Sequence, residues 1–456
     1  MELVSERVRR AFEKVLRFLA EALVRLYYPH RVVEGAERIS RDRPVVFVAN
    51  HPNGLLDPLL VRVLTGRPAR FLAKSTLFAN PAGRLAMDAF GSIPVYRAQE
   101  SGARAQGRTN DPSRNEESFA RCRAALARGE ALALFPEGVS HSDPQLRPLK
   151  TGAARITLSA AENAPGLEVV PLGLDYENKV LFRSRVLLVV GEPLPIAPRL
   201  PAYRSDERAA VDALTDDVRA RLDDVVLQAE SRELLNGIAR VAGWTGSAAG
   251  ASASDDADDL TARHRRAREL LTAYARVRAR DPARVDAIAA AARVYARTLQ
   301  RLGVSDPWAL EVELVRAGPA VRTLAKLILS APLAIVGVVM GYLPYRLAGR
   351  VAARVTQDED VLGTVKMIAG AVFLFAAWTA EAIFVGVRWG AIWGPPTFLL
   401  GVGSGYAALR FGEIAHDAAE AIRHLALRAF HRDTARRLAA RRRALADAVS
   451  AALQEA

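Results

Sequence analysis

The amino-acid sequence predicts an α/β fold, with a mixed, largely parallel sheet flanked by helices, followed by a helical arm and C-terminal membrane helices. Between residues 31 and 200, short apolar runs of strand length alternate with longer stretches of helical periodicity, which is the pattern of α/β domains. Arg and Ala then recur at helical spacing up to residue 303, and the composition becomes strongly apolar after residue 320. Because a single compact core does not hold 456 residues, we expect one domain of ordinary size plus further modules.

Residues 1–30 are expected to form an amphipathic N-terminal helix. Charges interrupt its apolar positions, so the segment fits neither a signal peptide nor a membrane span. One face is apolar, and the basic residues lie elsewhere: Arg9, Arg10, Lys14, Arg17 and Arg25. A helix of this kind packs on the body of the protein or lies on a membrane surface, and the sequence favours neither.

Residues 31–200 contain the elements of the sheet domain. The expected strands are the buried apolar runs 44–50, 131–135, 167–176 and 185–194. The expected helices are 57–65, 76–90, 114–129 and 150–163. Ligands of α/β sheets bind where strands end and helices begin, so the residues that follow these strands are the first candidates for a site.

Residues 201–320 are expected to form a helical arm. Its Arg- and Ala-rich stretches are separated by 244–258, where small and acidic residues are typical of a flexible linker. Neither the arm nor the linker carries recognisable chemistry.

Residues 321–410 are expected to form a hydrophobic membrane module. Three segments have about the length that crosses a bilayer, roughly 20 residues: 327–345, 367–387 and 389–409. A buried core helix is the alternative for each one, but their close succession favours a membrane. Arginines follow the first and third segments, so the positive-inside rule predicts a hairpin entered from the cytoplasmic side. We therefore expect a membrane location, which in a bacterium would be the inner (cytoplasmic) membrane, with residues 31–200 facing the cytoplasm.

The net charge of the chain indicates anionic partners. Lys and Arg number 63 against 50 Asp and Glu, and the formal charge of +13 fits membrane phospholipids, nucleic acid or phosphorylated substrates. The basic C-terminal helix expected at 411–456 follows the apolar segments, and no nucleic-acid motif accompanies it. We therefore expect anionic membrane lipids and no nucleic acid as partners, with a solvated basic face as the alternative for this helix. The single cysteine, Cys122, excludes an intrachain disulfide and lies in a helical pattern where packing is expected.

His51 and Asp57 are the candidate catalytic residues. The expected strand 44–50 leads directly into His51, and Asp57 lies six positions further on, at the start of the next expected helix. Imidazole accepts a proton near neutral pH, and a carboxylate on its other nitrogen fixes the tautomer, as in the base half of a Ser-His-Asp triad. The alternatives are an Asp57 that caps the helix before Pro58 and a His51 bonded to backbone.

Other polar residues follow the later strands. After 131–135 come Glu137 and Gly138, and then Lys150, which with Arg147 could hold a phosphate; His141 is a rival base. Arg97 closes a short strand, GSIPVYR (91–97). Arg183 and Arg185 are expected on one side of an extended strand, where they either clamp a phosphate or cover an edge.

Taken in order, these pieces resemble the glycerophospholipid acyltransferase superfamily over about residues 35–200. His51 and Asp57 match the first motif, Arg97 in GSIPVYR the second, Glu137 and Gly138 in FPEG the third, and Pro171 in VVPLGLDY the fourth. Five residues separate His51 from Asp57 where the common motif has four. That insertion, with the long third motif and the LFRSR stretch, looks closer to the fungal glycerol-3-phosphate and dihydroxyacetone-phosphate acyltransferases.

The resemblance implies a membrane-bound acyltransferase in phospholipid synthesis. His51 would be the general base and Asp57 its orienting partner; Arg97, Glu137 and Gly138 would bind the acceptor, with Lys74 nearby. Pro171 would shape the acyl-donor side. The donor would be an acyl thioester, either acyl-CoA or an acyl group carried on acyl carrier protein. The resemblance implies no metal and no bound cofactor.

The resemblance also sets the alternatives. The favoured acceptor is glycerol 3-phosphate, and 1-acylglycerol 3-phosphate (lysophosphatidate) is the rival. A membrane-anchored lipid-binding scaffold with a vestigial site is the non-enzymatic alternative.

Overall fold

The computed structural model describes residues 2–96, 112–246, 256–304 and 317–455. The chain divides into two compact units. Unit 1 contains Met1–Gln228 together with the short segment Asp358–Thr364, and unit 2 contains Ala229–Gln357 and Val365–Ala456. Each unit is described by itself.

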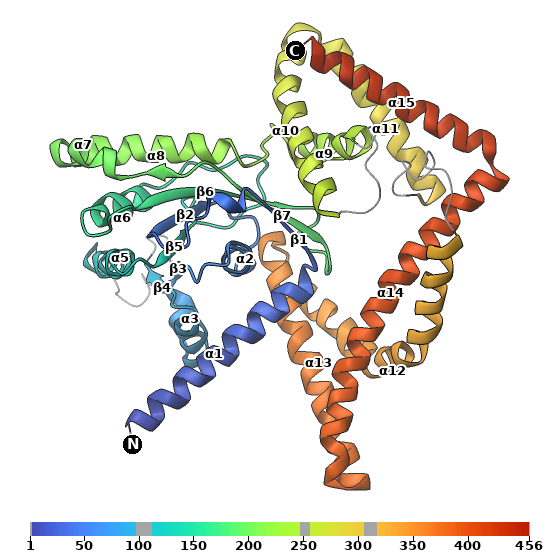
Figure 1. Cartoon of the computed structure of the whole chain (residues 1–456), viewed down its shortest axis with the longest axis horizontal. Helices are drawn as coiled ribbons and strands as arrows, with labels where there is room; N and C mark the ends of the chain where they lie inside the picture. Colours follow the sequence, from blue (N-terminus) through green and yellow to red (C-terminus); the bar gives the residue numbers. More distant parts are fainter. Residues whose placement is uncertain (1, 97–111, 247–255, 305–316, 456) are drawn as a thin grey trace. The chain divides into compact units, whose positions relative to one another are not determined.

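Unit 1 is built on one eight-stranded sheet formed by the described residues (Figure 1). Its strands are β1 (His30–Glu34), β2 (Val45–Ala49), β3 (Arg70–Lys74), β4 (Ile93–Val95), β5 (Ala131–Leu134), β6 (Glu168–Tyr176), β7 (Arg185–Val190) and β8 (Leu194–Pro195). Their order is β1-β7-β6-β2-β5-β3-β4, and β8 pairs with β6. The β6–β7 and β6–β8 pairs are antiparallel and the other pairs are parallel. The predicted mixed, largely parallel sheet is therefore confirmed.

The predicted strands correspond to β2, β5, β6 and β7 with β8, and the short strand within 91–97 to β4. The sequence analysis did not predict β1 and β3. Both are short and begin and end in charged or polar residues, HRVVE and RFLAK, so neither shows an uninterrupted apolar run.

Helices cover both faces of the sheet. Those of unit 1 are α1 (Glu2–Tyr27), η1 (Ala36–Arg38), α2 (Leu56–Thr65), η2 (Ser75–Phe78), α3 (Pro81–Ala89), α5 (Pro112–Ala127), α6 (Gly152–Ala161), η3 (Ala197–Arg199), α7 (Leu200–Ser205) and α8 (Glu207–Asp223). In Figure 1, α7 and α8 lie on one side of the sheet and α1, α2 and α3 on the other. The strand β2 lies between these layers, and all five of its residues are buried. The loops that follow β2 and its neighbours are therefore anchored to a rigid core.

The N-terminal helix α1 packs along α2 and α3. Its face is only partly covered, because Phe12 and Phe18 remain 50% and 71% exposed. Packing on the body of the protein thus leaves an apolar stripe that could also contact a membrane surface.

Unit 2 is entirely helical in its described residues. Its helices are α9 (Arg232–Gly246), α10 (Asp256–Arg280), α11 (Pro282–Leu302), α12 (Ala317–Val355), α13 (Glu359–Trp389, whose first turn belongs to unit 1), η5 (Ala391–Trp393), α14 (Gly394–Phe430) and α15 (Arg432–Gln454). Tyr295 of α11, Leu427 of α14 and Leu438 of α15 share one buried cluster. The linker predicted at 244–258 overlaps the ends of α9 and α10, and its central residues 247–255 lie outside the described residues.

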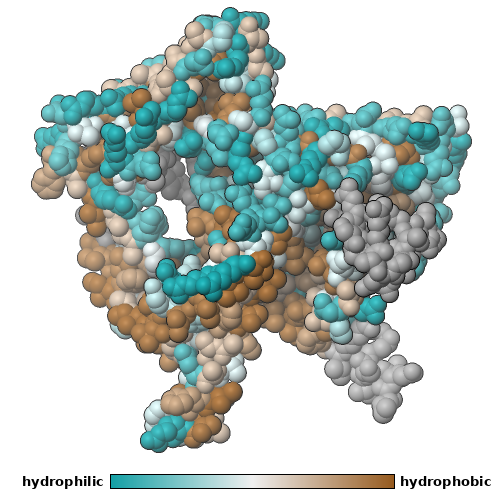
Figure 2. All heavy atoms as spheres, turned by 180° about the vertical axis from the view of Figure 1, so that it is seen from behind, coloured by the Kyte–Doolittle hydropathy of each residue, from teal (hydrophilic) through white to brown (hydrophobic). Residues whose placement is uncertain are grey.

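Two helices in the described part of the chain are long and apolar enough to cross a membrane, by length and composition. The first is Val321–Val355, within α12, and the second is α13. Many of their large apolar side chains are exposed, such as Leu329 at 85% and Val387 at 84%. Figure 2 shows the apolar side chains of unit 2 gathered over α12, α13 and α14, while α10, α11 and α15 are largely hydrophilic. These exposed apolar surfaces fit association with a membrane.

The third predicted segment, 389–409, does not form one helix of its own. Trp389 ends α13, Ala391–Trp393 form the short η5, and the remainder begins α14. Glycines and Ser404 lower the hydropathy of this stretch, and they serve packing instead. A Cβ on Gly337 of α12 would lie 1.9 Å from the carbonyl oxygen of Ser404, so α12 and α14 are in direct backbone contact.

Candidate active site

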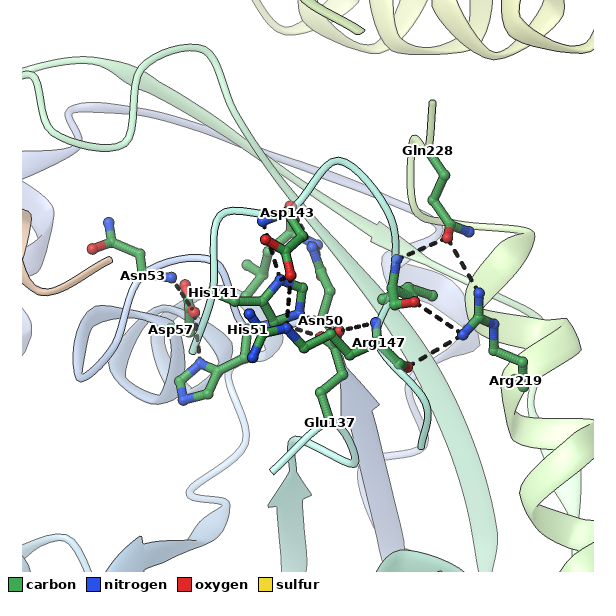
Figure 3. A network of polar contacts seen from close by, with 12 residues as sticks. Asn50, His51, Asn53, Asp57, Glu137, His141, Asp143, Arg147, Arg219 and Gln228 are labelled. Carbon is green, nitrogen blue, oxygen red and sulfur yellow. Dashed lines mark hydrogen bonds and ion pairs between the residues drawn. The ribbon is translucent and has the colours of Figure 1, made fainter. Parts of the chain in front are cut away.

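His51 and Asp57 lie at the carboxyl edge of the sheet. A short loop joins β2 to α2. His51 lies just beyond the strand, and Asp57 lies in the first turn of the helix. The Nδ1 atom of His51 is 2.8 Å from Oδ2 of Asp57, and the two side chains are 14% and 0% exposed. Figure 3 shows the imidazole directed at the carboxylate. The sequence prediction that these residues form a pair agrees with this geometry.

Asp57 is not the helix cap that its sequence context also allowed. The cap position of α2 is held by Leu55, without a side-chain hydrogen bond. The Asp57 carboxylate instead accepts the Asn53 N–H at 2.7 Å and the hydroxyl of Tyr176. Together with His51, three donors therefore converge on one buried carboxylate, which satisfies the charge inside the protein.

Tyr176 is a site residue that the sequence analysis missed. It ends β6, which runs parallel to β2, so the two strands present their last residues at the same edge. Burial, followed by the negative charge of Asp57, raises the pKa of Tyr176 well above its ordinary value. The phenol therefore stays protonated and donates to Asp57. The available signal was its position at the end of the strand that carries Pro171.

The ring of His51 is fixed on two sides. It stacks on Phe135, the residue after β5, with ring centroids 4.1 Å apart and an angle of 18° between the planes. Its Nε2 has no hydrogen-bond partner among the residues that the structure describes. With Nδ1 bound to the carboxylate, Nε2 is the nitrogen available to accept a proton from a bound hydroxyl.

Glu137 holds two loops together. It is 3% exposed, and its Oε1 accepts the His51 N–H at 3.3 Å. Its Oε2 accepts the Arg147 N–H at 2.8 Å and contacts Nε2 of His141. Both oxygens are thus used within the protein, so Glu137 positions these loops, and the acceptor contact that the resemblance implied stays a prediction.

His141 and Arg147 are also engaged within this loop (Figure 3). The other ring nitrogen of His141 accepts the Asp143 N–H at 3.2 Å, so both nitrogens are occupied and His141 is not an open base. The guanidinium of Arg147 pairs with Asp143 at 2.7 Å. Arg219 of α8 donates to the Arg147 carbonyl at 3.2 Å, which ties the loop to the helix layer.

Gly138 and Lys150 form an exposed cationic turn beside the buried Glu137. Gly138 adopts φ +75°, a left-handed conformation that glycine accepts without strain. The Lys150 side chain lies over this glycine, because a Cβ there would be 2.6 Å from Nζ. The Lys150 N–H donates to the Pro136 carbonyl at 2.8 Å, so the backbone of both residues is fixed. Lys150 therefore lies over the turn that contains Glu137, whose carboxylate accepts the His51 N–H.

The expectation for Arg183 and Arg185 is corrected. Arg183 has φ +66° and lies in the turn before β7, so the two arginines do not share one side of a strand. Arg183 donates to the Leu26 carbonyl at 3.4 Å, and Arg185 binds Glu177 through two contacts of 3.0 and 2.9 Å. Both guanidinium groups make protein contacts, which fits covering an edge better than clamping a phosphate.

The remaining predicted residues differ in placement. Lys74 is the exposed last residue of β3. Pro171 is buried within β6, where its carbonyl accepts the Gly191 N–H at 2.9 Å. Arg97 lies outside the described residues. Within the described parts of the chain, no group of three or more His, Cys, Asp or Glu residues is arranged to hold a metal ion.

A histidine with a buried carboxylate on one nitrogen and an open second nitrogen, at the carboxyl edge of an α/β sheet, is an arrangement suited to general-base activation of a hydroxyl group. Residues 30–175 match the family model described as Acyltransferase. Residues 30–175, about a third of the chain, are thus similar to this acyltransferase family.

Curated relatives match parts of the chain. Glycerol-3-phosphate O-acyltransferase 1 of Saccharomyces cerevisiae is 35% identical over 115 residues, covering 24% of this chain and 15% of the relative. A 1-acyl-sn-glycerol-3-phosphate acyltransferase of Chlamydomonas reinhardtii is 31% identical over 162 residues, covering 34% and 43%. An uncharacterized acyltransferase of Schizosaccharomyces pombe is 24% identical over 299 residues, covering 48% and 44%. The chain thus spans less than half the length of each relative.

Among solved structures, the 1-acyl-sn-glycerophosphate acyltransferase PlsC of Thermotoga maritima is similar at 20% sequence identity with a TM-score of 0.32. The match covers 48% of this chain and 83% of that one.

Proposed function

We propose that the protein transfers a fatty acyl group from an acyl thioester to the sn-1 hydroxyl of glycerol 3-phosphate, at a membrane. The observation that carries the proposal is the 2.8 Å contact of His51 with the buried Asp57, which leaves Nε2 open for a hydroxyl. The similarity to yeast proteins named glycerol-3-phosphate O-acyltransferases supports this acceptor. The two apolar helices support a membrane location.

In the proposed mechanism, Nε2 of His51 takes the proton of the acceptor hydroxyl as its oxygen attacks the thioester carbonyl. The new C–O bond forms and the C–S bond breaks. The imidazolium then gives its proton to the departing thiolate, so a thiol leaves and neutral His51 is restored. Asp57 stabilises the imidazolium and keeps the ring in the tautomer that presents a bare Nε2. Acyl-CoA and acylated acyl carrier protein present the same thioester carbonyl, so either can be the donor in this step.

Lys150 is the residue proposed to bind the acceptor phosphate. Its exposed ammonium lies over Gly138, beside the loop that Glu137 holds against His51. Replacing Lys150 with Met is expected to raise the KM for glycerol 3-phosphate on the order of 10-fold or more, whereas Lys150→Arg keeps the charge and most of the affinity. A KM that the Met variant leaves unchanged would assign the phosphate to another cation, such as Lys74.

The second candidate acceptor is 1-acylglycerol 3-phosphate, which the name of the Chlamydomonas relative favours. Presenting both acceptors with one donor and comparing kcat/KM decides between them. Thioester cleavage that responds to neither acceptor would overturn both, and lipid binding without turnover would support a scaffold with a vestigial site.

The base itself is tested with His51→Ala, which is expected to reduce kcat/KM by about 10²–10⁴-fold. The matched control is His30→Ala, which removes an exposed imidazole from β1. Acyl transfer by His51→Ala at the wild-type rate would overturn the mechanism.

A further inference from the structure

The segment Asp358–Thr364 belongs to unit 1, although it lies far along the chain from the rest of that unit. It contains the first turn of α13, and it packs directly on the loop between His51 and Asp57. A Cβ on Gly54 would lie 2.8 Å from the carbonyl oxygen of Asp360. A Cβ on Gly363 would lie 3.0 Å from Oδ1 of Asn53. One glycine on each side therefore allows the two backbones to approach closely.

A partly buried ion pair lies at this contact. The Asp360 carboxylate accepts the hydroxyl of Ser142 at 2.9 Å and lies 3.8 Å from the ammonium of Lys179. The side chains of Lys179 and Asp360 are only 16% and 21% exposed. Lys179 also contacts the Ser142 hydroxyl and donates to the Pro52 carbonyl at 2.9 Å. The loops after β5 and β6 and the first turn of α13 thus meet at one ammonium group.

The peptide group that contains the Pro52 carbonyl also contains the Asn53 N–H. This N–H donates to Oδ2 of Asp57 at 2.7 Å. The ammonium of Lys179 on the oxygen end polarises this peptide and strengthens the donation from its nitrogen end. A continuous chain of polar contacts therefore runs from Asp360 through Lys179 and the peptide to Asp57, and from Asp57 to His51.

We propose that Lys179 and Asp360 are positioning residues for the base, and that the first turn of α13 fixes the orientation of the peptide between Pro52 and Asn53 through them. Neither side chain needs to touch a substrate for this role. Lys179 holds the peptide oxygen, and Asp360 holds Lys179 and balances its partly buried charge. The inference rests on the proposed function of His51 and Asp57, and it ties their loop to the start of one of the two apolar helices.

The test uses steady-state kinetics of the purified full-length protein. Lys179→Met and Asp360→Asn are expected to lower kcat by about 10-fold or more, the effect of losing a charge-assisted hydrogen bond, with both KM values within about twofold of wild type. Lys179→Arg retains the charge and the donor, so it is expected to recover most of kcat. In the double variant the losses should not multiply, because both residues act through one peptide.

Thr364→Val is the matched control. Thr364 lies in the same segment and its buried hydroxyl has no hydrogen-bond partner among the described residues, so the replacement keeps the packing and leaves the ion pair intact. This variant is expected to keep the kcat and Tm of the wild type.

The outcomes separate this inference from the proposed function. An inactive His51→Ala beside a Lys179→Met variant with wild-type kcat would overturn the positioning role alone. If kcat and Tm both fell, and the Thr364→Val control lost kcat to the same extent, the segment would serve folding. If only the KM for the acceptor rose, Lys179 would serve substrate binding. Either result contradicts the inference. Wild-type activity in His51→Ala would overturn the proposed function instead.

Discussion

Replacing Tyr176 with Phe removes one hydroxyl group and leaves the ring in place. In the native protein this hydroxyl donates to Oδ1 of Asp57, whose side chain is fully buried. The Tyr176 ring packs against Tyr28 with centroids 5.4 Å apart, so the Phe side chain retains its packing. The substitution therefore removes the hydrogen bond to the carboxylate that orients His51 while keeping the ring packing.

The magnitude follows from the charge and the burial of the acceptor. A hydrogen bond to a charged group contributes roughly 1.5–3 kcal/mol, and a buried carboxylate cannot replace the lost donor with bulk water. At about 1.4 kcal/mol per factor of ten, kcat/KM is expected to fall by roughly 10- to 150-fold if the whole effect reaches the transition state. The Asn53 N–H and His51 still bind Oδ2, so some orientation survives.

The assay follows release of the thiol from the acyl thioester at saturating donor, with acceptor concentration varied. Tyr27→Phe is the control, because the Tyr27 hydroxyl donates to the Val180 carbonyl at 3.3 Å and not to Asp57. If Tyr176→Phe and the control have the same kcat/KM as the wild type, Tyr176 does not support the base and the reasoning is refuted.

Three further predictions concern the same unit. Asp57→Asn is expected to lower kcat by roughly 10³–10⁴-fold, because an amide donor stabilises the tautomer with a protonated Nε2; the same thioester assay would show it, and a minor loss would contradict the assigned role. Burial raises the pKa of the Cys122 thiol to about 12, so a thiol reagent at pH 8 should label it only after denaturation. The thiol of the unfolded chain ionises at about pH 8.5. The free energy of unfolding should therefore fall as the pH rises from about 8.5 toward 12. Phe47→Ala, at a fully buried position of β2, should cost about 3–5 kcal/mol of unfolding free energy in urea titrations, and a cost under about 1 kcal/mol would place Phe47 outside the core.

Several expectations depended only on local pattern and agree with the structure. The apolar runs around β2, β5 and β6 are strands because their side chains are buried on both faces of the sheet, which leaves a continuous apolar signal in the sequence. The spacing of His51 and Asp57 across a strand end and a helix start fixed their proximity, because a tight turn leaves few other arrangements. The short, charged strands β1 and β3 lacked such a signal and gain their conformation from neighbouring strands.

The roles of the charged side chains were decided by tertiary structure. Arg183 and Arg185 were predicted to share one side of a strand, but a left-handed turn at Arg183 separates them. For Glu137, only the folded chain shows that its two oxygens bind the loops of His51 and Arg147. Whether a charged group is open to a ligand depends on which distant groups reach it, and local sequence contains no record of those contacts.

The sequence by itself therefore determined the α/β class, the proximity of His51 and Asp57 and the presence of long apolar helices, since each of these depends on periodicity or on spacing within one turn. Only the tertiary structure decided that Tyr176 and the Asn53 N–H complete the environment of Asp57, and that Lys179 and Asp360 meet beside it. These groups come from strand ends, loops and a helix start that are remote in the chain. The pairing of parallel strands and the close packing of Gly54 against Asp360 bring them together, and that arrangement is a property of the folded sheet domain.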